Sequence, residues 1–134
     1  MRGKAARFVV AMTFVLAAAG CSREPPAQQA AARFVDTYYV KINPGGALEL
    51  STGQAKEKLV KELQRLAGVG PVDESDRPQI RAALRKGSVE DNGAVFTFEI
   101  QSVSDGVSQL SVNVYLEESR GRWLVNDFHE SENE

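Results

Sequence analysis

Apolar and polar residues alternate with a period of two over the C-terminal part of the chain. The alternation runs through residues 94–103 and 109–118, and a third apolar segment follows at residues 122–130. This pattern is typical of strands that bury one face of a sheet. Asp105 and Gly106 are turn-forming residues between the first two segments. The pattern therefore predicts an antiparallel meander.

Turn-forming residues also precede the strand predicted at residues 94–103 and separate the segments at residues 109–118 and 122–130. Asn92 and Gly93 are the pair that most strongly predicts a hairpin, because both tolerate positive φ. Residues 119–121 predict another turn.

The last segment is less regular. Strict alternation places Trp123 and Val125 on one face of the strand, with Leu124 and Phe128 on the other. Residues 131–134 are polar and acidic, and we expect them to form a frayed tail.

Residues 79–90 fit two structures. Ile80, Ala82 and Leu84 alternate as in a strand, whereas Ile80, Ala83 and Leu84 would share one face of a helix. We favour a strand because a meander follows.

Helical periodicity comes earlier in the chain. Ala31, Phe34, Val35 and Tyr38 occupy positions i, i+3, i+4 and i+7, which form one stripe of an amphipathic helix. Residues 43–46 contain proline and two glycines, and they predict its end.

A second helix is predicted after residue 51. Ser51 and Gln54 have the spacing of a capping box at a helix start. Glycines 68 and 70 predict its end. Its apolar stripe consists of Ala55, Leu59, Leu63 and Leu66, with Val60 and Ala67 beside it.

The order of these elements predicts the fold class. Helices come first and strands follow, which favours α+β over alternating α/β. We expect a single domain over residues 30–130, with N-terminal helices packed on a curved antiparallel sheet of three to four strands.

The first twenty residues have the layout of a secretory signal peptide. Residues 1–7 are basic, residues 8–19 are apolar apart from one threonine, and Gly20 and Cys21 follow. The apolar run is too short for the roughly 20 residues that a helix needs to cross a bilayer.

Residues 16–21, LAAAGC, resemble the lipobox of bacterial lipoproteins. The resemblance implies cleavage between Gly20 and Cys21 and acylation of Cys21, so that several acyl chains would anchor the protein to a membrane. The family prefers leucine three residues before the cysteine, where this chain has Ala18.

The residues after the cysteine add a location and a tether. In Gram-negative lipoproteins, a residue other than aspartate at the position of Ser22 implies the outer membrane, facing the periplasm. Residues 22–29 include two prolines, and we expect an extended tether of about 25 Å.

Charge and residue types exclude several functions. Without the three basic residues of the first seven, the chain has 13 basic and 18 acidic residues, which argues against nucleic-acid binding. His129 is the single histidine and Cys21 the single cysteine. We therefore predict neither a metal site nor a cofactor.

Residues 31–42 (AARFVDTYYVKI) and 121–128 (GRWLVNDF), in this order of helices and strands, resemble the nuclear transport factor 2-like cone fold. More narrowly, the chain is similar to small bacterial lipoproteins of uncharacterised function built on that fold. The resemblance covers roughly residues 28–130. Because the cone fold carries enzymes as well as binding modules, it implies no single activity.

Candidate pocket residues follow from residue type. They are Asp36, Tyr38, Tyr39, Tyr115 and Asp127. Each also has an ordinary structural explanation, such as solvent exposure for Asp36 or core packing for Tyr38, so no catalytic residue is assigned.

Two functions are compatible with these residues. We favour a non-enzymatic envelope lipoprotein that binds a partner protein or a small apolar ligand at the open face of its sheet. The alternative is an isomerase or hydratase that uses a Tyr/Asp pair in the cone pocket. The enzyme requires a carboxylate buried beside a tyrosine.

Overall fold

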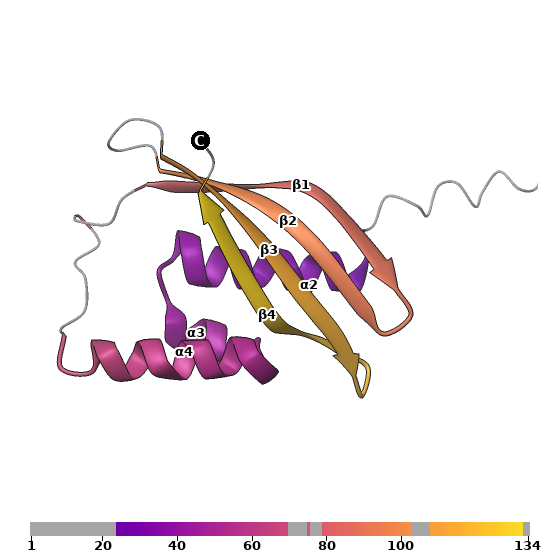
Figure 1. Ribbon diagram of the computed structural model, residues 1–134, viewed down its shortest axis with the longest axis horizontal. Helices are drawn as coiled ribbons and strands as arrows, with labels where there is room; N and C mark the ends of the chain where they lie inside the picture. Colours follow the sequence, from indigo (N-terminus) through magenta and orange to yellow (C-terminus); the bar gives the residue numbers. More distant parts are fainter. Residues whose placement is uncertain (1–23, 70–74, 76–78, 103–107, 133–134) are drawn as a thin grey trace, which may run out of the picture.

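The structure is a computed structural model that describes residues 24–69, 75, 79–102 and 108–132. Helical segments come first along the chain and strands follow (Figure 1). The helical segments are α2 (Pro26–Val35), the π-helix η3 (Asp36–Val40), α3 (Pro44–Leu48) and α4 (Gly53–Leu66). The strands are β1 (Ile80–Glu90), β2 (Gly93–Ser102), β3 (Ser108–Ser119) and β4 (Arg122–Glu132).

These strands form one curved antiparallel sheet in the order β1-β2-β3-β4. Helix α2 runs across one face of the sheet, α4 lies beside β4, and α3 packs against α4 and η3 (Figure 1). The predicted α+β class is confirmed, and residues 80–90 are a strand, as favoured from their alternation.

The core lies between the helices and the sheet face that they cover, which we call the inner face. Alternate residues of the strands point into it because strand side chains alternate between faces. Phe34 from α2 and Leu59 from α4 are completely buried against this face. The inner-face core residues are Phe96, Phe98, Ile100, Val112, Val114, Leu116, Val125 and Phe128.

The face assigned to Phe128 from strict alternation is wrong. The pairing of β3 with β4 shifts register between Tyr115, which pairs with Asp127, and Leu116, which pairs with Val125. Asn126 is therefore an extra residue, a β-bulge, and it rotates Phe128 onto the same face as Val125. Phe128 is buried there, 6% exposed.

The extended geometry expected for residues 22–29 is wrong for its second half. Helix α2 begins at Pro26, and Ala27 is already buried in the core. Proline is favoured at the first helical position because its fixed φ suits the helix and its missing N–H would have no partner there. The prediction of a frayed tail over residues 131–134 is also wrong for residues 131–132, which belong to strand β4.

The capping box predicted at Ser51 does not form. Its hydroxyl donates to the Leu48 carbonyl oxygen at 2.8 Å, and α4 begins at Gly53 without a side-chain cap. Ser51 instead belongs to a short parallel bridge with Val125 of β4. The Thr52 N–H donates to the Val125 carbonyl oxygen at 2.8 Å, so this segment covers part of the β4 edge.

The apolar stripe of α4 is buried only in its first half. Ala55 and Leu59 are fully buried, whereas Leu63 is half-buried and Leu66 is 42% exposed. The helix passes beyond the sheet before its stripe ends (Figure 1).

The hairpins follow the predicted positions with one shift. Arg120 and Gly121 have positive φ of 54° and 78°, as a tight turn of the primed type requires. In the first hairpin Glu90 pairs with Gly93, so the two loop residues are Asp91 and Asn92 instead of the predicted Asn92 and Gly93. Neither Asn92 nor Gly93 adopts the positive φ expected from the sequence.

Three sequence predictions lie outside the described residues: the signal peptide, the lipobox with Cys21, and the turn at residues 105–106.

Candidate functional site

The sheet face opposite the core, which we call the outer face, carries an open groove of about 730 Å³. Val95 and Tyr115 lie in it beside Gly93, and the start of α4 contributes Gly53 and Gln54. Its polar and charged side chains include those of Ser88, Glu90, Glu117, Asn126, Asp127 and His129.

A second groove of about 430 Å³ adjoins the first. Both are lined by Ser88, Val95 and Tyr115, so they are continuous over the middle of the sheet. The second groove adds Lys86, together with Thr97 and Asn113, whose hydroxyl and amide oxygens are hydrogen-bonded across β2 and β3 at 2.7 Å.

The strand register explains why these side chains meet. Paired residues of antiparallel neighbours point to the same face, so each row across the sheet is a row of neighbouring side chains. One row contains Ser88, Val95, Tyr115 and Asp127, and the next contains Lys86, Thr97, Asn113 and His129. The Asn126 bulge produces this match, because it brings Asp127 opposite Tyr115.

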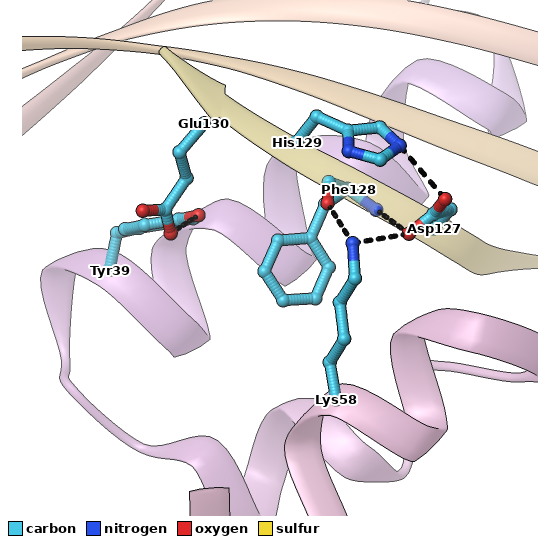
Figure 2. A network of polar contacts seen from close by, with 6 residues as sticks. All are labelled: Tyr39, Lys58, Asp127, Phe128, His129 and Glu130. Carbon is cyan, nitrogen blue, oxygen red and sulfur yellow. Dashed lines mark hydrogen bonds and ion pairs between the residues drawn. The ribbon is translucent and has the colours of Figure 1, made fainter. Parts of the chain in front are cut away.

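A network of polar contacts joins the groove to α4 (Figure 2). The Lys58 ammonium donates to Oδ1 of Asp127 and to the Phe128 carbonyl oxygen, both at 2.6 Å. It also lies 5.1 Å from the centroid of the Phe128 ring. Nε2 of His129 lies 2.9 Å from Oδ2 of Asp127. Lys58 therefore links the helix layer to the outer-face pair of Asp127 and His129.

This network keeps Asp127 ionised. Burial alone would raise the pKa of the Asp127 carboxyl, but hydrogen bonds from Lys58 and from the backbone N–H of Phe128 outweigh it and hold the pKa below its usual range. Asp127 also holds Nε2 of His129, and the Tyr115 and His129 rings pack edge to face with their centroids 5.7 Å apart. The three side chains form one contiguous cluster.

Tyr38 and Tyr39 lie elsewhere, on η3. The Tyr38 hydroxyl donates to Glu62 of α4, and the Tyr39 hydroxyl donates to Oε1 of Glu130 at 2.6 Å. Burial raises the pKa of both phenols, and the hydrogen bond to a carboxylate raises each further. The two hydrogen bonds connect η3 to α4 in the helix layer and to β4 in the sheet, so they stabilise the packing of the two layers.

The structure divides the five predicted pocket residues among three places. Tyr115 and Asp127 are neighbours in the outer-face groove, Tyr38 and Tyr39 face the helix–sheet junction, and Asp36 is exposed in an ion pair with Lys41 at 3.2 Å. They do not form one pocket.

Sequence reasoning gave no functional role to His129, Lys58, Glu62 or Glu130. The spacing of Asp127 and His129, two residues apart on a strand, is a signal that both point to one face. Lys58 has no comparable signal, because it reaches Asp127 from 69 residues away in the chain.

The arrangement can bind polar and aromatic groups, and the residues present do not indicate a metal centre. Within the described ranges, no three or more His, Cys, Asp and Glu side chains are grouped to hold a metal ion. In the same ranges, no helix is both long and apolar enough to span a bilayer. No protein-family model matches the chain, and neither does any curated protein.

Proposed function

We propose that the protein is a lipid-anchored binding protein of the bacterial envelope, whose domain holds a partner or ligand in the outer-face groove. The observation that carries this proposal is the groove itself. In this groove Tyr115 is 36% exposed, on a face that the helices do not cover. The polar side chains around it carry hydroxyl, amide, carboxylate and imidazole groups, which can hydrogen-bond a ligand. Exposed aromatic rings surrounded by polar groups are typical of binding surfaces.

The proposed anchor is Cys21, and the proposed location is the outer membrane, facing the periplasm. Because α2 begins at Pro26, only residues 22–25 would separate the lipidated cysteine from the helix. Four residues span at most about 14 Å, which is shorter than the tether expected from sequence. The domain would therefore be held close to the lipid surface.

We also infer that the fold is of the nuclear transport factor 2-like cone type. The helix-first order and the curved antiparallel sheet support this inference. In such a cone, a ligand pocket would lie between the helices and the inner face. Here that space holds aromatic rings in contact, with centroids of Phe34 and Tyr38 at 5.3 and 5.4 Å from that of Phe128.

This packing weighs against the alternative of an isomerase or hydratase. That enzyme would need a Tyr/Asp pair in the cone pocket, but Tyr38 and Tyr39 are hydrogen-bonded to glutamates and Asp36 is in solvent. Asp127 lies on the other face of the sheet, where its carboxylate already accepts hydrogen bonds from Lys58 and from a backbone N–H. A base in that state is a weak proton acceptor.

Replacement of the anchor tests the location. In a Gram-negative host, the full chain should incorporate labelled palmitate and partition with detergent on phase separation. Cys21→Ser should abolish both, while the neighbouring change Ser22→Ala should preserve both. Retention of label or of detergent partitioning by Cys21→Ser would contradict the lipoprotein proposal.

Photocrosslinking in the same cells tests the binding face. A photoreactive phenylalanine analogue at position 115 should form adducts with an envelope component, whereas the analogue at the exposed position 66 of α4 should not. Gly93→Leu, which fills the groove, should remove the adducts from position 115. Adducts that are identical at both positions, or that persist in Gly93→Leu, would contradict the groove as the binding site.

A further inference from the structure

The groove has two unpaired carboxylates at the end nearest the β1–β2 hairpin. Glu90, Gly93 and Glu117 form one row across β1, β2 and β3, next to the row that contains Tyr115. The two glutamates are roughly 10 Å apart, which is two strand spacings. Both are exposed, and neither forms an ion pair with any residue of the described ranges.

Gly93 creates the space between these carboxylates. A Cβ built at Gly93 would have the Leu116 carbonyl oxygen, at 3.9 Å, as its one neighbour within 4 Å. The backbone of Gly93 does not need glycine, since its φ lies outside the left-handed region. The gap is therefore open and can hold a group that contacts both glutamates.

Charge varies along the groove. Asp127 is compensated by Lys58, so the uncompensated negative charge is that of Glu90 and Glu117. Lys86 is the cationic side chain of the adjoining groove, four residues before Glu90 on the same strand. Four residues of strand span about 13 Å, so the two charged ends are separated by the length of a short extended peptide.

Between these ends lie Tyr115 and Val95, flanked by hydrogen-bonding side chains. The alkyl stem of a lysine or arginine packs on apolar and aromatic surface while its head stays at charged groups. A cation near an exposed tyrosine ring also gains from the ring quadrupole. The two carboxylates, the tyrosine ring and the open gap thus match a long basic side chain, that of lysine or arginine.

We propose that the groove binds an extended segment of a partner protein, with a lysine or arginine side chain placed between Glu90 and Glu117. This inference rests on the proposed function, and it specifies the chemistry of the partner. The charge complementarity and the length of the two continuous grooves favour a peptide segment over a free amine, because a single amine would leave the Lys86 end empty.

Fluorescence anisotropy on the detergent-purified full chain tests this inference. The probe is a labelled peptide, Gly-Lys-Ala-Ser-Ala-Glu-Gly, in which lysine and glutamate are four residues apart. Its matched control has norleucine in place of lysine. We expect the lysine peptide to bind about tenfold more tightly than the control, with an advantage that decreases as salt is added.

Variants of the chain separate the charge from the groove. Glu90→Gln combined with Glu117→Gln should weaken binding of the lysine peptide about tenfold and leave the norleucine peptide unchanged. Glu49→Gln, an exposed glutamate outside the groove, should change neither. Gly93→Leu should abolish binding of both peptides. Unchanged thermal unfolding curves will show that each variant is folded.

The possible failures are distinguishable. Equal binding of both peptides, or full binding by the double glutamine variant, would overturn the cation inference while leaving the groove as a binding site. Spermidine that binds as tightly as the peptide would overturn the choice of a peptide over a free amine. If neither peptide binds, the cation inference fails, and the photocrosslinking at position 115 still decides the proposed function.

Discussion

The inner and outer faces of the sheet are built from alternate residues of the same strands, yet they are used differently. On the inner face Phe96, Phe98 and Val114 are covered by helices and are at most 4% exposed. On the outer face the neighbouring Val95, Thr97 and Tyr115 line the grooves. Period-two patterning thus separates a face that stabilises the fold from one that the helices leave uncovered.

The difference shows in what each face would lose on mutation. Inner-face side chains contact one another at close-packed distances, so a deletion leaves a cavity. Outer-face side chains border open space, so a deletion there leaves no cavity and would remove mainly a contact for the proposed ligand. Stability should therefore depend on the inner face, and the proposed binding on the outer one.

Mutation of the inner face should cause the greatest loss of stability. Phe34→Ala should lower the free energy of unfolding by about 3–5 kcal/mol, because Phe34 is fully buried against Phe128. Val95→Ala on the outer face should cost below about 1 kcal/mol. Urea unfolding followed by Trp123 fluorescence measures both, and equal losses would contradict the division between the faces.

Two glycines of one hairpin provide a second contrast. A Cβ at Gly87 would lie 2.1 Å from the Phe96 ring, so Gly87→Ala should destabilise by about 1–3 kcal/mol through overpacking. Gly93→Ala, on the outer face of the next strand, should change stability by less than about 0.5 kcal/mol. Thermal unfolding curves of the two variants measure this difference in stability. A Gly87→Ala variant as stable as Gly93→Ala would mean that the inner face is not tightly packed at Gly87.

The strands could be predicted from sequence because each depends on a local pattern. The alternation over residues 94–103 and 109–118 identified β2 and β3 and their buried faces. It failed at Phe128, because the Asn126 bulge depends on how β4 pairs with β3 rather than on β4 alone. The helical pattern in turn did not predict the start of α2 at Pro26. Its first turn contains mainly proline and polar residues, and only the tertiary packing shows that Ala27 is buried in the core.

The candidate site was predictable in part for the same reason. Tyr115 and Asp127 were chosen by residue type, but their adjacency depends on the bulge-shifted register. Lys58 comes from a distant helix, and no local pattern connects it to β4. The residues that border the groove near the hairpin were equally hidden, since exposed glutamates look alike until the register places two of them around a glycine.

Lys58 tests the division between the faces directly, because its ammonium joins α4 to Asp127 of the outer face. Lys58→Met should cost about 1 kcal/mol, since screening of a side chain that is 39% exposed weakens its ion pair. The pKa of Asp127 should rise, which NMR titration of its carboxyl carbon would detect. Lys61→Met on the same helix is the control and should leave that pKa unchanged.

Acid provides the smallest and most specific test, because the folded state holds the pKa of Asp127 below its ordinary value of 3.8. A carboxyl whose pKa is lower in the folded than in the unfolded state stabilises the fold fully above the ordinary value, and this stabilisation is lost as the pH falls through the lowered one. At pH 7, Asp127→Asn should therefore be the less stable protein, by about 1 kcal/mol. The difference from wild type should shrink progressively as the pH falls below 3.8. Urea midpoints at several pH values measure it, with Asp36→Asn as the exposed control. A difference that stays constant with pH would show that Asp127 acts through packing and not through its charge.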